Sequence, residues 1–237
     1  PQLFAGCGFD ALFFQRLGER GSPTDFQWRG LDGTSLRSVW LAGGYAVFWR
    51  CPSSLPEFSA MADKRLGFLE AQCSPGPLLA LTGADIAAPE PQLAPMVEAY
   101  NASQDRYELV FSTPRRYLEE SDAAAKARAA AGGAGLPVLE GDRNPVFTGC
   151  NSARIRVKQL NRELETALLD AEKLEAAAWM VGPAAPAGPG AAAPLLDAWE
   201  PVLFNQFHDI ICGSHVDSTY RAAIGRFAIS ADLAEAR

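Results

Sequence analysis

The sequence predicts an α/β fold followed by a bundle of helices. In the first half of the 237 residues, short apolar runs of strand length alternate with segments of helical spacing, which is typical of a parallel sheet covered by helices. After a Gly-rich break at 132–137, three successive segments carry amphipathic helical stripes, which predicts a three-helix bundle. We therefore expect an α/β domain over 1–131, a linker over 132–150 and a helical domain over 151–237.

Local patterns place the elements of the first half. Phe26–Gly33 reads as a strand that runs into an Asp-Gly turn, and Leu36–Leu41 as the returning strand of that hairpin. Further strands are expected at Ala11–Phe14, Leu78–Leu81 and Tyr107–Phe111. Helices are expected at Pro56–Ala71, Gln92–Tyr100 and Thr113–Ala131.

The helical half has one long stripe and two shorter ones. The long stripe runs from Val157 to Ala178, and Ser152 is the expected N-cap of its helix. The segment 182–194, built from Pro, Ala and Gly, reads as a loose loop. The second stripe runs from Leu195 to Leu203, where Pro201 is expected to kink or delay the helix. The third runs from Val216 to Ala231.

Charge and composition exclude several classes of partner. A net charge of −7 disfavours nucleic acid and anionic lipid, and no run of apolar residues is long enough to span a membrane. The five cysteines form no C-x-x-C pair, so we expect reduced, mostly buried thiols and a cytoplasmic protein rather than a zinc ribbon. The chain opens on apolar sequence without a signal peptide, which favours a piece of a longer protein. Whether the chain forms a homo-oligomer is left open by the sequence.

Few residues have the chemistry of a site. His208 is followed by Asp209 and flanked by aromatic residues, and neutral imidazole beside a carboxylate suits zinc. One histidine is not a zinc site, however, and a lone histidine is more often a packed or surface residue. The other histidine, His215, reads as a loop or helix-start residue and receives no role. Asp85, after the strand expected at Leu78–Leu81, is either a turn residue or a site carboxylate at the end of a strand.

A rival site lies near the start of the chain. Gly6-Cys7-Gly8 follows the apolar stretch Gln2–Phe4, and a G-x-G turn after a strand can cradle a nucleotide or S-adenosylmethionine. No third glycine follows, so a plain turn is the preferred interpretation. The nucleotide reading requires a strand, a turn and a helix in that order.

Four stretches together resemble the α-mannosidases of glycoside hydrolase family 38. Phe26–Gly33 is similar to the family's F-x-W-x-x-x-D-G hairpin, and Thr82–Asp85 to its N-G-x-D-H segment. Asn144–Arg162 resembles N-P-V-F-x-G-C-Y-S-S-R-I-x-x-K-Q-x-N-R, and Phe204–Ser214 resembles F-N-Q-F-H-D-I-x-x-G-S. Thr82 and Ile86 depart from the family's Asn and His, which weakens the match around Asp85.

The resemblance implies a fold and a mechanism. It implies the C-terminal part of a barrel-like α/β catalytic domain followed by a three-helix bundle, and a retaining, zinc-dependent hydrolase of α-linked mannose. His208 would be a zinc ligand, Asp209 would face the mannose, and Asp85 would hold the place of the acid/base. The other zinc ligands and the nucleophile would precede Pro1, so the chain alone is expected to be inactive. The alternative is a non-catalytic remnant that binds carbohydrate or serves as a scaffold.

Overall fold

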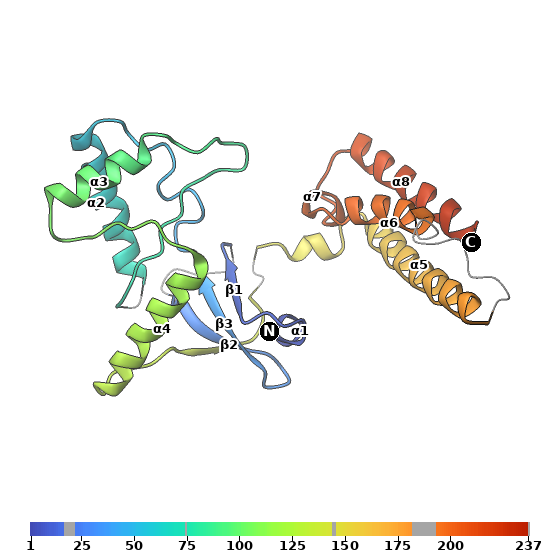
Figure 1. Ribbon diagram of the computed structural model, residues 1–237, viewed down its shortest axis with the longest axis horizontal. Helices are drawn as coiled ribbons and strands as arrows, with labels where there is room; N and C mark the ends of the chain where they lie inside the picture. Colours follow the sequence, from blue (N-terminus) through green and yellow to red (C-terminus); the bar gives the residue numbers. More distant parts are fainter. Residues whose placement is uncertain (17–21, 74, 144–145, 182–192, 237) are drawn as a thin grey trace. The chain divides into compact units, whose positions relative to one another are not determined.

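The computed structural model describes residues 1–16, 22–73, 75–143, 146–181 and 193–236 (Figure 1). These residues form two compact units, Pro1–Val146 and Phe147–Arg237. The division lies within the segment 132–150 that the sequence assigns to a linker. Among the described residues, no helix is long and apolar enough to cross a membrane.

The first unit contains a four-stranded mixed sheet in the order β1-β3-β2-β4 (Figure 1). Its strands are β1 (Ala11–Phe14), β2 (Asp25–Arg29), β3 (Ser35–Trp40) and β4 (Val138–Glu140). The predicted hairpin is present, since β2 and β3 are antiparallel with Phe26 opposite Ser38. Both outer strands run parallel to their neighbours, and the antiparallel pair β2–β3 makes the sheet mixed, whereas the sequence suggested a parallel sheet.

Three of the four helices of this unit follow the predicted pattern closely, and α1 (Gln2–Gly6) was not predicted. The other three are α2 (Leu55–Gln72), α3 (Leu93–Ser103) and α4 (Pro114–Ala130). Thr113 caps α4, because its side chain accepts a hydrogen bond from the amide of Arg116. The apolar face of α2 is buried against α3, where Phe58 and Tyr100 pack with ring centroids 5.9 Å apart.

Three expectations for this unit are wrong. No strand forms at Leu78–Leu81 or Tyr107–Phe111 in the described residues. At Leu109 the Asn101 side chain hydrogen-bonds both the main-chain N–H and the carbonyl, at 2.9 and 2.8 Å, and so takes the place of a neighbouring strand. Conversely, β4 lies inside the segment 132–150 that was expected to be a linker, and its pairing with β2 makes it part of the sheet.

A buried polar cluster joins α4 to the sheet. Arg37 of β3 donates to Asp25 of β2 at 2.6 Å, and their side chains are only 7% and 6% exposed. Ser121 and Tyr117, both on α4, donate to the same carboxylate at 2.8 and 2.9 Å. Arg37 also donates to Asp122. The cluster is fully hydrogen-bonded, which is the condition for burying an ion pair at low cost.

The second unit is helical. It comprises the short 3-10 turn η1 (Thr148–Asn151) and the helices α5 (Ile155–Val181), α6 (Ala193–Asn205), α7 (His208–Ile211) and α8 (Asp217–Glu235). The three long helices α5, α6 and α8 each contact the other two (Figure 1). Their buried core consists of Val157, Leu164, Leu168, Leu195, Ala198, Val202 and Phe227.

Several details of this unit depart from the expectations. Leu174 and Leu203, placed in the apolar stripes, are exposed, as is Val216. Helix α6 runs without interruption through Pro201. Ser152 precedes the start of α5 by three residues and donates to the carbonyl of Gly149, so it does not cap that helix.

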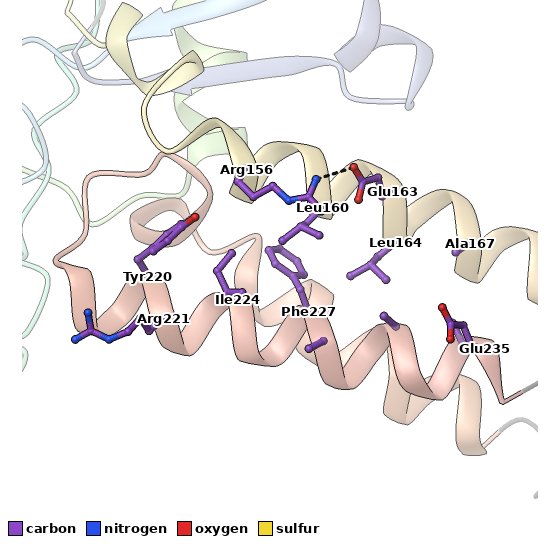
Figure 2. A pocket seen from close by; sticks show the side chains of 13 residues that line it. Arg156, Leu160, Glu163, Leu164, Ala167, Tyr220, Arg221, Ile224, Phe227 and Glu235 are labelled. Atoms are coloured by element: carbon purple, nitrogen blue, oxygen red, sulfur yellow. Dashed lines mark hydrogen bonds and ion pairs between the residues drawn. The ribbon is translucent and has the colours of Figure 1, made fainter.

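A groove of about 640 Å³ runs between α5 and α8 (Figure 2). Its floor is apolar, with Leu160 and Leu164 of α5 facing Ile224 and Phe227 of α8. Tyr220 lines one end of it. Neither His208 nor Asp209 lines this groove, so it is distinct from the site considered next.

Candidate functional site

The segment before His208 is anchored to two long helices. Asn205 is fully buried at the end of α6 and donates to the carbonyl of Ala223 on α8 at 2.9 Å. Gln206 donates to the Glu165 carboxylate on α5 at 2.8 Å. These two hydrogen bonds hold the C-terminal end of α6 in place, and therefore also the start of the segment that leads to His208.

The structure brings together the two longest motif stretches of the sequence. Glu165, which accepts from Gln206, also accepts from Asn161 at 2.9 Å and pairs with Arg162. Asn161 and Arg162 end the Asn144–Arg162 stretch, and Gln206 belongs to Phe204–Ser214. The polar residues of both motifs therefore have a shared structural task, which is to hold α6 against α5.

His208 and Asp209 open the short helix α7. Their side chains are 80% and 69% exposed, and His208 Nε2 lies 3.7 Å from an Asp209 carboxylate oxygen. The ring of Phe207, the N-cap residue, packs 4.3 Å from the His208 ring. An imidazole and a carboxylate are thus presented side by side at the surface of this unit.

The loop after α7 is packed tightly against the turn before α5. Gly213 has φ +79°, and a Cβ there would overlap the carbonyl group of Ala153. Lys158 donates to the same carbonyl oxygen. Only glycine fits this close approach, because a side chain would meet backbone and the φ angle is unfavourable for L residues.

Two titratable groups where this loop meets α5 are perturbed, Lys158 of α5 and Cys212 of the loop. Partial burial lowers the pKa of Lys158, an effect that Cys212 and Cys150 partly offset. Burial and the charge of Asp209 would raise the pKa of the Cys212 thiol, but hydrogen bonds with Ser214, helped by the charge of Lys158, outweigh them and leave the pKa below its usual value. The Cys212 sulfur lies 3.0 Å from Ser214 Oγ.

Sequence reasoning missed His215. Its Nδ1 lies 3.2 Å from the carbonyl oxygen of Asp209, so the second histidine contacts the segment that carries the first. A signal was available in the spacing, since a residue six positions after Asp209 can fold back on it when glycine intervenes.

Asp85 belongs to the other unit. It is exposed and lies in a turn closed by the 3.3 Å hydrogen bond from the Ala87 amide to the Ala84 carbonyl. The strand that was to carry it to a sheet edge is not formed. The structure therefore places Asp85 in the turn that the simpler interpretation suggested, and its role as acid/base stays a prediction.

His208 and Asp209 are side chains of the kind that bind zinc, but they are too few to form a zinc site. A protein zinc site uses three or four protein ligands, and His208 with Asp209 offers two. Among the described residues, no group of three or more His, Cys, Asp or Glu side chains lies close enough to hold a metal ion. The described part of the chain therefore does not close a zinc site by itself.

The rival site at Gly6-Cys7-Gly8 lacks the required geometry. The stretch before the turn is the helix α1, not a strand, and the strand β1 follows the turn. A nucleotide-cradling turn needs the reverse order, with the amides at a helix N-terminus facing the phosphate. The turn is a plain connection.

The cysteines are all free, but they are not mostly buried. Only Cys51 is buried, Cys7 is exposed, and the others are intermediate. Burial raises the pKa of Cys51, as expected for an inert thiol.

Comparisons with known proteins give a family match over the helical unit and structural similarity over the whole chain. Residues 145–236 match the family model of the α-mannosidase middle domain. No curated protein matches the sequence. Among solved structures, an α-mannosidase from Enterococcus faecalis is similar over 99% of this chain, with a TM-score of 0.76 and 22% identity. A protein in glycosyl hydrolase family 38 from the same organism is similar over 99% of the chain, with a TM-score of 0.66 and 23% identity. This chain covers 27% and 24% of those two chains.

Proposed function

We propose that this chain is part of a glycoside hydrolase family 38 α-mannosidase, and that it supplies one zinc ligand and one wall of the mannose site to a longer enzyme. The match of the helical unit to the middle-domain model and the similarity in fold support this proposal. The proposal includes the architecture. The unit Pro1–Val146 is the end of a barrel-like catalytic domain, and α5, α6 and α8 form the three-helix bundle that follows it.

One observation carries this proposal. His208 and Asp209 are exposed together on α7, inside the matched middle domain, where polar residues of both long motifs hold the preceding segment in place. The 80% exposure of His208 supports this role, because a ligand that completes a site with other parts of the polypeptide must be accessible. Because the chain covers about a quarter of the similar structures, the remaining ligands have ample room elsewhere.

The residues of this chain have distinct tasks in the proposed reaction. His208 offers a neutral imidazole nitrogen to the zinc ion, which when bound holds the mannose hydroxyl groups and polarises them. Asp209 accepts hydrogen bonds from those hydroxyl groups. Asp85 is the proposed acid that protonates the leaving oxygen, while a carboxylate outside this chain attacks the anomeric carbon. The product retains the α configuration.

The five free cysteines support a reducing compartment, which is why we propose that the enzyme is cytoplasmic. The net charge of −7 is consistent with a neutral sugar as the substrate, and it disfavours nucleic acid.

The test uses the complete polypeptide. We expect one zinc ion per chain by elemental analysis and hydrolysis of a nitrophenyl α-mannoside, with NMR showing α-mannose as the first product. The β-mannoside is the matched control substrate and should not be cleaved. A complete polypeptide that binds no zinc and cleaves neither substrate would replace this proposal with the non-catalytic remnant. This chain alone is expected to be inactive.

A further inference from the structure

We propose that His215 is a positioning residue, which holds α7 and thereby fixes the direction in which His208 and Asp209 face. This inference rests on the proposed function for its consequence in catalysis, but not for its structural content. Its basis is the 3.2 Å contact between His215 Nδ1 and the Asp209 carbonyl oxygen.

The direction of this hydrogen bond follows from its partner. A carbonyl oxygen only accepts, so the proton must be on His215 Nδ1. The other ring nitrogen, Nε2, is buried and has no hydrogen-bond partner within the described ranges. The ring is therefore held to the site segment through Nδ1 alone.

The ring is itself fixed from the side of α8. It stacks on Tyr220, with an interplanar angle of 16° and centroids 6.2 Å apart. The Arg154 guanidinium lies 4.8 Å from the centre of the same Tyr220 ring. Arg154 also donates to the His215 carbonyl at 3.1 Å and to Asp217 at 2.7 Å.

Arg154 adopts an unfavourable backbone conformation in order to do this. Its φ of +46° lies in the left-handed region, which is sterically unfavourable for a non-glycine residue. Its contacts with His215, Asp217 and Tyr220 offset that cost. The turn before α5, the start of α8 and the His215 ring thus form one connected support.

Helix α7 needs such support because it is very short. Its four residues make few internal hydrogen bonds, and an isolated helical turn is unstable in water. The bond from His215 reaches it from outside, directly at the residue that follows His208. Without it, the backbone of Asp209 would be held only through its neighbours, and both side chains would sample a wider range of directions.

Three substitutions of His215 isolate the bond. In His215→Asn the side-chain amide can occupy the position of Nδ1 and donate to the Asp209 carbonyl, whereas in His215→Gln it reaches the position of Nε2. His215→Ala removes both. All three lose the stacking on Tyr220, so the contrast between Asn and Gln reports on the hydrogen bond alone.

The primary readout is amide hydrogen exchange in the complete polypeptide. The amides of Ile210, Ile211 and Gly213 are bonded within and just after α7. We expect their exchange to become about 3- to 10-fold faster in the Ala and Gln variants, the size of one lost hydrogen bond, and to stay near the original rate in the Asn variant. Equal rates in the original protein and the Ala variant, or in the Asn and Gln variants, would overturn the proposal.

The kinetic readout is separate from the structural one. We expect kcat on an α-mannoside to fall about 10-fold in the Ala and Gln variants, with zinc content retained and most activity kept in the Asn variant, as for residues that orient metal ligands. If the original protein proves inactive and free of zinc, the proposed function fails, while the exchange contrast still decides whether His215 holds α7. If activity is present but unchanged in all three variants, the positioning role fails and the proposed function stands.

Discussion

Gln206 donates a hydrogen bond to Glu165 over 2.8 Å, and this contact joins the residue two positions before His208 to the middle of the long helix α5. Replacing Gln206 with Ala should lower the free energy of unfolding of the helical unit by about 1.5–3 kcal/mol, since the acceptor is charged and half-buried. Gln159→Ala, an exposed position on the same helix α5, is the matched control and should change it by less than about 0.5 kcal/mol. Chemical denaturation followed by circular dichroism measures both, and equal effects would contradict the anchoring role.

Substitution by Ala is expected to have opposite effects on stability at Gly213 and at Gly225. At Gly213, Ala should destabilise the protein by well over about 1 kcal/mol, because φ is +79° and the new Cβ would overlap the Ala153 backbone. At Gly225, in helix α8, the Cβ meets nothing within 4 Å, so Ala should stabilise by about 0.5–1 kcal/mol. Thermal unfolding of the two variants checks the difference in sign. A neutral result at Gly213 would show that the loop does not approach α5 as described.

The buried cluster of the first unit predicts a large effect at Asp25. Asp25→Ala leaves the Arg37 guanidinium buried beside α4 without its main partner and should cost about 3–5 kcal/mol. Glu70→Ala breaks the exposed pair with Arg106 and should cost no more than about 1 kcal/mol. Unfolding monitored by tryptophan fluorescence measures both, since Trp28 and Trp40 lie in the strands β2 and β3 of this unit. Similar losses in the two variants would refute the burial of the cluster.

The same cluster predicts a loss of stability in alkali. Burial, together with the Asp25 carboxylate, raises the pKa of Tyr117. A folded-state pKa above the unfolded value of about 10 means that the contribution of this group is complete below pH ~10 and is lost as the pH rises beyond it. The melting temperature should therefore fall above pH ~10, and fall less steeply in Tyr117→Phe. Identical slopes in both proteins would contradict the assignment.

The sequence predicted the long helices because their apolar spacing is sustained over many residues. Helices α2, α4 and α5 begin and end within a few residues of their predicted bounds. Short apolar runs were less informative. At Leu109 the Asn101 side chain satisfies the backbone in place of a strand, a tertiary contact that no local pattern contains. The three residues of β4 were missed because so short a strand is defined by its partner, not by its own pattern.

The sequence singled out the candidate site residues but not the contacts that support them. The residue types and aromatic neighbours singled out His208 and Asp209, and the resemblance of Phe204–Ser214 to the family segment supplied their roles, which stay predictions. The role of His215 depends on a loop that folds back on Asp209, and that geometry follows from the close packing of Gly213 on Ala153. The relation appears only once the start of α5 and the start of α8 are placed together.

The central claim is that His208 is a ligand of the zinc ion in the complete enzyme. The most direct measurement is the zinc affinity of the complete polypeptide, by competition with a chelator, before and after His208→Ala. We predict a fall of about 10–100-fold or more, with activity on an α-mannoside lost in parallel and partly restored by excess zinc. Asp197→Asn, which removes an exposed carboxylate of the neighbouring helix α6, should leave the zinc affinity unchanged. Unchanged zinc affinity in the His208→Ala protein would contradict the account.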